Sequence, residues 1–431
     1  MTCRKWLVAA SAAVIMITII TLGLVADVSA ADKYEVIYNI PGVAGGAGPL
    51  AGLISDAAGN LYGTASFEGD ASFGGNGAVF KLSHDAGGRW RGTVLHTFQG
   101  KDGANPTGGL IFDRAGNLYG TTVHGGKYGN STFGGTVFKL TPEPAGMWSE
   151  TVLHSFQGKD GANPTGDLVI DKAGNLYGTT ESGGGHNSGL VFKLAPDTND
   201  ECIETVLHDF QGTDGATPAG GLIFDRAGNL YGTTSSGGTH NNGTVFKLSP
   251  DASGEWSETV LHSFQGSPDG ANPYAGLIFD RAGNVYGTTY NGGVLSFGGV
   301  GTVFKLSPEP NGEWTETVLH IFQTTGPPNF QTTGGSRPQA RLIFDRAGNL
   351  YGTAAVGGSG GVGVVFKLSR EANGEWTETV LRSFQGFPDG AEPMGALIID
   401  AAGNLYGTTT AGGNSANCFI GGCGTVFQIT P

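Results

Sequence analysis

The motif Gly-Asn-Leu-Tyr-Gly-Thr recurs seven times along this chain of 431 residues, once with Val in place of Leu. Successive copies lie 54 to 65 residues apart. The tyrosines that mark the copies are Tyr62, Tyr119, Tyr177, Tyr231, Tyr286, Tyr351 and Tyr406. A near-constant period of this length indicates a tandem-repeat architecture, in which each copy is one supersecondary unit that stacks on its neighbours.

Each unit contains four short segments that favour β-strands. In the second unit these are residues 110–112, 118–122, 136–140 and 151–156, which are rich in β-branched and aromatic residues and bounded by turn-forming residues. No amphipathic helical pattern lies between them. Four strands in roughly 57 residues suit one blade of a β-propeller, whereas a parallel β-helix needs shorter coils. We therefore predict an all-β fold, a seven-bladed β-propeller with four antiparallel strands per blade.

The two ends of the chain predict how the ring closes. Residues 35–40 match the fourth segment of a unit, and residues 425–429 match the third. The seventh blade would then take its outermost strand from the N-terminus, which protects its edge from pairing with another chain. We predict a single propeller domain over residues 31–431.

A second motif, Asp-x-Ala-Gly-Asn, comes just before the tyrosine motif in every unit. In the second unit Asp113 can accept hydrogen bonds within its own turn, and Gly116 can adopt the left-handed conformation that closes it. A calcium loop is the alternative, because carboxylate and amide oxygens suit that ion. One Asp and one Asn per unit are few ligands, so the motif favours a hairpin turn.

Charge and the N-terminus limit the partners. The net charge is −14 and no basic run occurs, so we expect no binding to nucleic acid or to anionic membranes.

Residues 1–30 read as a signal peptide: Arg4 and Lys5 precede an apolar run that ends before the small residues 28–30. An uncleaved membrane anchor is the alternative, since the apolar run is long enough to span a bilayer. We expect a secreted or cell-surface protein.

The Gly-Asn-Leu-Tyr-Gly-Thr-Thr string, a glycine-rich loop and Gly-Thr-Val-Phe-Lys-Leu together resemble the GloVer tandem repeat, and all seven units carry this pattern. Proteins of that group are bacterial, carry export signals and often end in a surface anchor. The resemblance implies a secreted, propeller-like repeat protein and implies no particular activity. No anchor follows Pro431, which favours a released protein. The inner-strand pattern also resembles NHL-type propeller repeats, which are mostly binding scaffolds.

Several repeated residues are expected to be structural. Five histidines occupy one position in five units, namely His96, His154, His208, His262 and His320. Each would lie on the outermost strand of a different blade, too far from the others to share one ion at ligand distances of about 2 Å. Tryptophans such as Trp148 recur before the same strand and are expected to pack at the blade edge.

One position breaks the repeat with two charges. Just before the inner strand, five units carry Gly or Ala, whereas the third unit carries Asp167 and the sixth carries Arg341. These residues would lie roughly across the ring from each other. Near a channel mouth they would bind a polar ligand. The alternative is that each charge is solvated or paired locally.

The glycine-rich loops also vary between units. They carry Phe73, Phe133 and Phe297 in units one, two and five, and His124, His186 and His240 in units two to four. These loops are expected to share a face with the Asp-Gly-Ala-x-Pro connections. Aromatic rings beside polar groups are typical of sugar-binding sites, and packing between loops is the alternative.

The seventh unit alone carries Cys418 and Cys423, which predict a local disulfide in an exported chain. The sixth unit has a long insertion, residues 324–341, that would be a lid or a tolerated loop.

No catalytic motif, metal-binding set or cofactor motif is visible, so we expect no metal and no cofactor. The sequence favours a monomeric, non-catalytic scaffold that binds an extracellular glycan or protein. A polysaccharide hydrolase or lyase with its site at the channel is one alternative, and a structural envelope or matrix protein is another.

Overall fold

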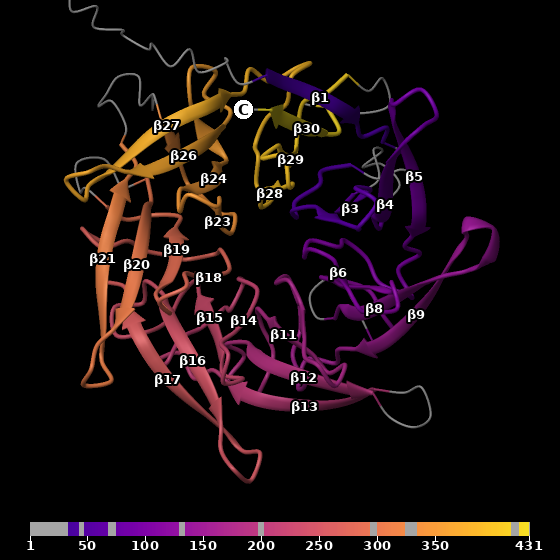
Figure 1. Cartoon of the computed structure of the whole chain (residues 1–431). Helices are drawn as coiled ribbons and strands as arrows, with labels where there is room; N and C mark the ends of the chain where they lie inside the picture. Colours follow the sequence, from indigo (N-terminus) through magenta and orange to yellow (C-terminus); the bar gives the residue numbers. More distant parts are fainter. Residues whose placement is uncertain are drawn as a thin grey trace, which may run out of the picture.

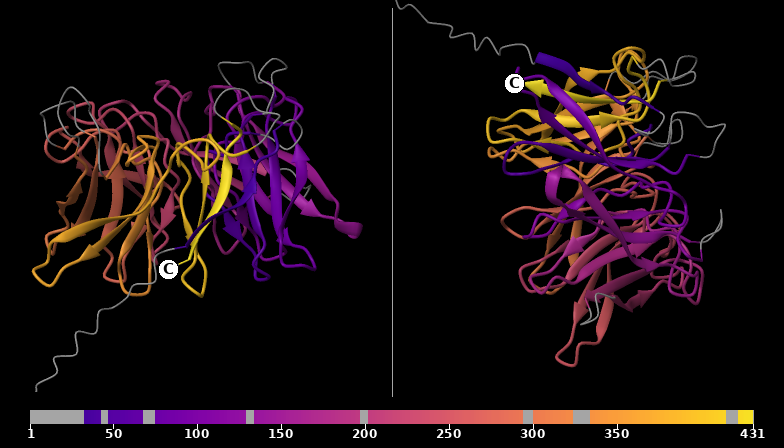
Figure 2. Two further views of the ribbon diagram at one scale, coloured as in Figure 1. Left: turned by 90° about the horizontal axis from the view of Figure 1, so that it is seen from above. Right: turned by 90° about the vertical axis from the view of Figure 1, so that its right-hand side faces the viewer.

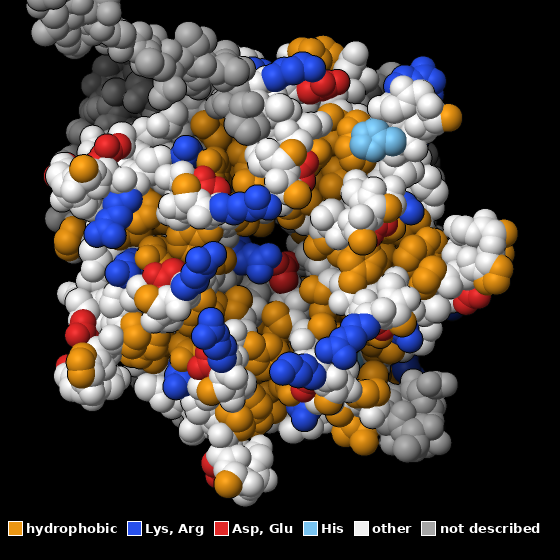
Figure 3. Space-filling model, viewed as in Figure 1, with side chains coloured by type: hydrophobic (Ala, Val, Ile, Leu, Met, Phe, Trp, Pro, Cys, Tyr) orange, Lys and Arg blue, Asp and Glu red, His pale blue; other side chains and the backbone are white. Residues whose placement is uncertain are grey.

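The computed structural model describes residues 33–42, 47–67, 75–128, 134–196, 202–293, 300–323, 334–414 and 422–430. Seven four-stranded antiparallel sheets are arranged as blades in a ring around a central opening (Figure 1). The predicted seven-bladed β-propeller is confirmed. Figure 3 shows the opening from one face of the molecule.

The strands of a blade run outward from the channel in chain order. The inner strands are β2 Ile54–Ser55, β6 Ile111–Phe112, β10 Val169–Ile170, β14 Ile223–Phe224, β18 Ile278–Phe279, β23 Ile343–Phe344 and β28 Ile398–Ile399. The second strands are β3 Leu61–Ala65, β7 Leu118–Thr122, β11 Leu176–Thr180, β15 Leu230–Thr234, β19 Val285–Thr289, β24 Leu350–Ala354 and β29 Leu405–Thr409.

The third and fourth strands are longer. The third strands are β4 Ala78–His84, β8 Thr136–Pro142, β12 Leu190–Pro196, β16 Thr244–Pro250, β20 Thr302–Pro308, β26 Val364–Arg370 and β30 Thr425–Thr430. The fourth strands are β5 Trp90–Thr97, β9 Trp148–Ser155, β13 Cys202–Asp209, β17 Trp256–Ser263, β21 Trp314–Ile321, β27 Trp376–Ser383 and, in the seventh blade, β1 Lys33–Asn39. A small extra ribbon pairs β22 Gly335–Ser336 with β25 Val356–Gly357, and a 3₁₀ turn spans Pro144–Gly146.

The seventh blade joins the two ends of the chain. Its sheet has the order β1-β30-β29-β28, and β1 pairs antiparallel with β30 from Lys33 opposite Thr430 to Asn39 opposite Thr425. The outermost strand of this blade therefore comes from the N-terminal segment. Within the described residues, no helix is long and apolar enough to cross a membrane.

The core lies between adjacent blades. In the first junction, Phe98 at the end of the first blade packs edge-to-face on Phe138 of the second blade, with ring centroids 5.1 Å apart. Both rings are fully buried. Gly120 in the tyrosine motif must stay small, because a Cβ there would lie 2.6 Å from the tip of the Phe138 ring. Trp148 packs at the same junction against Tyr62, as its expected role at the blade edge requires.

The Asp-x-Ala-Gly-Asn motif forms a hairpin turn between the first two strands of each blade. Asp113 Oδ1 accepts the backbone N–H groups of Ala115 and Asn117 at 2.8 and 2.9 Å. Its Oδ2 accepts the Asn117 amide at 2.6 Å and the Tyr119 hydroxyl at 3.0 Å. Donors of the same blade thus occupy both carboxylate oxygens, as the predicted turn requires.

These turns define one face of the ring, which we call the turn face. The connections between blades and the glycine-rich loops lie at the other ends of the strands, on what we call the loop face (Figure 2). The backbone of Ala104, in a connection, bridges that of His124, in a glycine-rich loop. The loops and connections therefore share a face, as predicted.

Candidate functional site

A ring of seven residues, one from each blade, lines the central channel. They are Gly52, Gly109, Asp167, Gly221, Gly276, Arg341 and Ala396. A cavity of about 460 Å³, lined mainly by apolar residues of the inner strands, lies on the turn-face side. A smaller cavity of about 110 Å³ opens on the loop-face side and is lined by more polar residues. Both cavities touch Asp167 and Arg341, which the sequence had singled out.

Asp167 and Arg341 are the charged members of this ring, and both are half-buried. Asp167 Oδ1 accepts the backbone N–H of Gly109 at 2.6 Å, so the neighbouring blade holds its carboxylate in place. The Nε atom of Arg341 is buried and has no hydrogen-bond partner among the described residues. No ion pair between the two side chains occurs in the described part of the chain. Arg341 thus lines both cavities of the channel, while its Nε atom is shielded from solvent.

A variable ring surrounds the loop-face mouth of the channel. It is formed by the residue that follows the proline of each connection: Leu50, Thr107, Thr165, Ala219, Tyr274, Gln339 and Met394. These residues were not among those predicted from the sequence. The available signal was their diversity, because this position carries six residue types in seven units while its neighbours are nearly constant.

Tyr274 stands out in the variable ring. Its side chain is 37% exposed, and its ring packs edge-to-face on Tyr290 with centroids 5.5 Å apart. The Arg337 guanidinium lies over Tyr290 at 5.5 Å. Burial, followed by the nearby charge of Glu181, raises the pKa of the Tyr274 hydroxyl. Two aromatic rings and a guanidinium thus lie side by side at the mouth.

Glu181 adds a carboxyl group on the same side of the mouth. It accepts a hydrogen bond from Thr165 at 2.9 Å. Burial raises the pKa of Glu181, and the Thr165 hydrogen bond opposes that rise. A carboxyl group with a raised pKa keeps its proton to a higher pH than an ordinary carboxyl group does.

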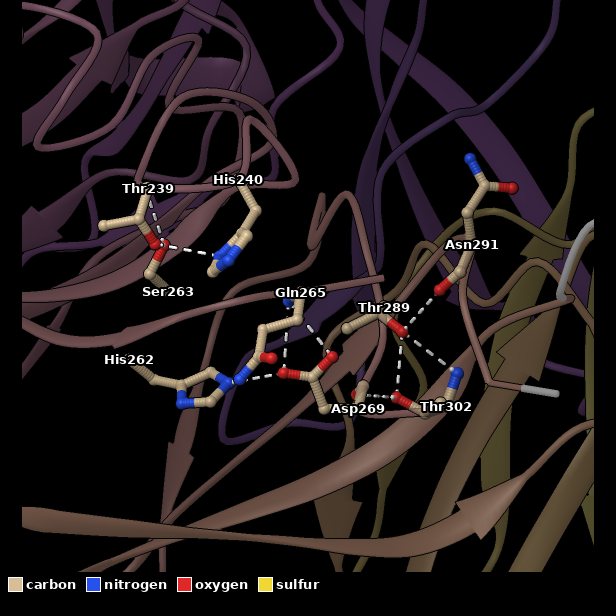
Figure 4. A network of polar contacts seen from close by, with 9 residues as sticks. All are labelled: Thr239, His240, His262, Ser263, Gln265, Asp269, Thr289, Asn291 and Thr302. Atoms are coloured by element: carbon tan, nitrogen blue, oxygen red, sulfur yellow. Dashed lines mark hydrogen bonds and ion pairs between the residues drawn. The ribbon is translucent and has the colours of Figure 1, made fainter. Parts of the chain in front are cut away.

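Of the predicted loop residues, the three histidines lie away from the channel cavities, and the three phenylalanines lie outside the residues that the structure describes. Phe73, Phe133 and Phe297 lie outside the described residues. The described loop histidines all have local partners: His124 with Asn163 at 3.4 Å, His186 with Asp209 at 3.7 Å, and His240 with Thr239 at 2.9 Å (Figure 4). Within the described part of the chain, none of the three lines either cavity of the channel.

Four of the repeated outer-strand histidines contact the connection that follows their own strand. The Nε2 atoms of four of them lie 2.9 to 3.1 Å from the Asp of the following connection: His96–Asp102, His154–Asp160, His208–Asp214 and His262–Asp269. Figure 4 shows the last of these pairs, in which Asp269 also accepts the backbone N–H of Gln265. In the fifth unit, whose following connection lacks this Asp, His320 lies 3.5 Å from Glu378 of the sixth blade. Each of the five histidines thus lies beside a carboxylate, and their purely structural role stays a prediction.

Glu150 of the second blade lies beside the pair formed by His96 and Asp102. The ligand atoms of His96, Asp102 and Glu150 all lie within 4.8 Å of one another, close enough to be considered for a metal ion. The hydrogen bond of 2.9 Å already pairs His96 with Asp102. Burial, and then the charge of Asp102, raises the pKa of Glu150 to about 7.

The remaining predicted features lie largely outside the description. Cys423 is fully buried and disulfide-bonded, whereas Cys418 lies outside the described residues, so their pairing stays a prediction. Of the long insertion, residues 324–333 lie outside the description. Its last part, from Gly335, pairs with β25 and ends in the channel residue Arg341.

The seven sheets and the charged channel define the chain as a seven-bladed β-propeller built from one tandem repeat. The profile of the Gloeobacter/Verrucomicrobia repeat matches residues 21–226, 131–329 and 324–431. The chain therefore belongs to this repeat family. Comparison with curated proteins found no significant match.

Solved structures share the fold at low sequence identity. The extracellular domain of a putative one-component system from B. thetaiotaomicron aligns with a TM-score of 0.54, 10% identity and 91% of this chain. This chain spans only 40% of the length of that protein. A polysaccharide lyase of family PL25, an ulvan lyase, aligns with a TM-score of 0.53, 15% identity and 91% of this chain against 95% of its own. The same enzyme bound to -[GlcA(1-4)Rha3S]- gives a TM-score of 0.52 at 14% identity. These similarities establish the propeller fold.

Proposed function

We propose that this chain is an exported, non-catalytic binding propeller that takes an extracellular glycan at the loop-face mouth of its channel. The observation that carries the proposal is the pair of charges in the channel ring. Asp167 is held by the neighbouring blade, and Arg341 has a buried Nε without a hydrogen-bond partner in the described residues. Glycine or alanine suffices at this position in the other five blades, so the propeller fold does not need these two charges.

The surroundings of the pair suit a carbohydrate. Tyr274 offers an exposed aromatic face of the kind on which sugar rings stack, while Gln339 offers an amide group that binds hydroxyls. Arg341 would bind a carboxylate or sulfate of an acidic sugar. Structures with the same fold include an extracellular domain and an enzyme that binds an acidic polysaccharide, which supports the extracellular setting and the ligand class.

One observation favours a second function, a polysaccharide lyase or hydrolase at the same mouth. Glu181 has a raised pKa and lies near Tyr274, which together offer a proton acceptor and a proton donor. Arg341 would stabilise the negative charge that develops on an acidic sugar during proton abstraction. The binding scaffold remains the first proposal, because nearly identical blades leave few residues for an active site.

The test is calorimetric titration of residues 31–431 against a panel of neutral and acidic polysaccharides, followed by an assay for new reducing ends and unsaturated products. The variants Asp167→Gly and Arg341→Ala introduce residues that other blades carry at this position, so they preserve the fold. Lys101→Ala, exposed elsewhere on the loop face, is the matched control. Binding without product that is lost in both channel variants supports the scaffold.

Product release that Glu181→Gln abolishes would replace the scaffold with the enzyme. Binding that survives both channel variants would overturn the assignment of the site. No binding to any member of the panel would overturn the glycan proposal and leave a protein ligand or a structural role.

A further inference from the structure

The turn face carries a row of basic side chains that the sequence scatters along the chain. The residue after Asp in the turn motif is basic in five units and exposed in all five: Arg114, Lys172, Arg226, Arg281 and Arg346. The other two units, the first and the seventh, carry Ala57 and Ala401. Because those two blades are neighbours in the closed ring, the five basic residues form one uninterrupted arc, which we call the basic arc. Figure 3 shows Lys and Arg side chains gathered around the opening on this face.

The cations of the basic arc are free to bind. Among the described residues, no ion pair or hydrogen bond to any of their side chains occurs. The Asp beside each of them is already satisfied, as Asp113 illustrates with its four accepted hydrogen bonds. An incoming anion therefore meets exposed guanidinium and ammonium groups, while the adjacent carboxylates point into their own turns.

Two clefts lie along the basic arc. The larger, about 1110 Å³, lies between the turns of blades five to seven, with Arg281 and Arg346 beside the apolar side chains of Phe279 and Phe344. The second, about 530 Å³, lies between blades two and three and is lined by Arg114, Lys172, Phe112 and Ile170. An apolar wall beside a cation suits an acidic sugar, whose C–H face packs on the wall while its anion pairs with the cation.

The rim of the same face excludes a flat anionic surface. Exposed acidic residues occupy the long hairpins between the third and fourth strands of the blades, at the edge of the ring: Glu143, Asp251, Glu309 and Glu371. Figure 1 shows these hairpins at the periphery. A lipid bilayer would bring its negative charges against this rim, whereas a single chain that follows the arc stays away from the rim and meets the cations beside turn aspartates that already accept hydrogen bonds.

We propose that the basic arc is a second binding site, on the face opposite the proposed glycan site, and that it takes a linear anionic polysaccharide with carboxylate or sulfate groups. The repeat of about one cation per blade engages successive sugars of such a chain, and each contact releases counterions from the polyanion. The affinity then falls with added salt. The propeller would thus hold an acidic polymer on its turn face while its loop face stays accessible.

The experiment measures binding of residues 31–431 to dextran sulfate and to polygalacturonate as a function of NaCl concentration. The variant Arg281→Ala/Arg346→Ala gives blades five and six the residue that blades one and seven already carry, so the turns keep their fold. Lys101→Ala/Lys159→Ala removes two exposed charges from the loop face and is the matched control. The arc variant is expected to bind dextran sulfate at least about tenfold more weakly at low salt and to show a shallower salt dependence. The control is expected to bind like the parent protein.

Equal weakening by both double variants would overturn the proposal, since it would mean that total charge alone drives binding. Absence of binding of either polymer by the parent protein would overturn it too. Tighter binding to vesicles of phosphatidylglycerol and phosphatidylcholine than to either polymer would replace the polysaccharide with a membrane surface. Arg281→Ala/Arg346→Ala leaves Asp167 and Arg341 of the channel ring intact, so the binding that these two substitutions weaken belongs to the basic arc and not to the proposed glycan site.

Discussion

Tyr38 of β1 fills the space that Gly92 of β5 leaves open where the seventh blade meets the first. A Cβ on Gly92 would overlap the Tyr38 ring. At the equivalent positions of the junction between blades one and two, His96 takes the place of Tyr38 and Glu150 takes that of Gly92. The junction that closes the ring therefore replaces a polar contact with an aromatic side chain packed over a glycine.

This pairing predicts that restoring the repeat consensus at Gly92 harms the protein. Gly92→Glu is expected to lower the free energy of unfolding by about 2 kcal/mol, because the added side chain collides with Tyr38. The double variant Tyr38→His/Gly92→Glu rebuilds the contact of the other junctions and is expected to recover most of the loss. Urea unfolding of the four proteins in this cycle measures the coupling. Equal destabilisation by the single and double variants would contradict the pairing.

The raised pKa of Glu150 predicts that the free energy of unfolding depends on pH near neutrality. Burial, and then the charge of Asp102, raises its pKa from 4.5 to about 7. The native state thus holds a proton that the unfolded chain releases above pH 4.5, so this stabilisation is complete below pH 4.5 and is lost as the pH rises through 7. Glu150→Gln is expected to raise the free energy of unfolding at pH 8 by about 1 kcal/mol and to change it little at pH 5.

Thermal unfolding of the Glu150→Gln variant and the parent at both pH values provides the measurement. Glu309→Gln, exposed on a hairpin, is the matched control and should show no such difference between the two pH values. A variant that is equally destabilised at pH 5 and pH 8 would show that the charge of Glu150 supports the junction.

The lowered pKa values of the turn aspartates predict the opposite dependence: the free energy of unfolding falls as the solution becomes acidic. Burial alone would raise the pKa of Asp225, but the hydrogen bonds from Asn229, Ala227 and Tyr231 hold it below 3.8. The stabilisation is present above pH 3.8 and is lost as the pH falls through the lower native pKa. Asp225→Asn is expected to cost about 1 kcal/mol at pH 7, because the amide accepts these hydrogen bonds less well than a carboxylate. Denaturant unfolding at pH 7 and pH 3 checks this, and a cost that persists unchanged at pH 3 would contradict it.

Cys423 predicts a measurable effect of reduction. Its buried sulfur is disulfide-bonded, and we expect Cys418 to be the partner. Closing so short a loop is expected to contribute about 2 kcal/mol, so dithiothreitol should lower the melting temperature by a few degrees. Peptide mapping without reduction should recover residues 418 and 423 in one cross-linked peptide and Cys202 as a free thiol. A cross-link to any other cysteine would refute the pairing.

The architecture could be predicted from the sequence because its signals are local. Strand segments and hairpin turns each depend on residues within one unit, and the closing strand could be recognised because residues 35–40 match the fourth segment of a unit. Asp167 and Arg341 could be singled out in the same way, since a charge that interrupts a column of glycines is visible without a structure. The variable ring around Tyr274 was also visible in the sequence, as a position of diverse residues directly after the constant proline of each connection.

Contacts between blades could not be predicted in this way. Glu150 lies 54 residues after His96, and Tyr38 lies 54 residues before Gly92, yet each pair meets at one junction. The basic arc is the clearest case: its five cations are more than 50 residues apart in the chain, so no basic run appears in the sequence.

The sequence by itself determined the repeat, the four strands of each blade and the turns that join them, because these depend on side chains only a few residues apart. The tertiary structure decided which charges become neighbours. When seven blades close into a ring, residues at the same position of successive repeats come to lie on one circle. This geometry places Asp167 and Arg341 in one channel and five isolated cations in one arc.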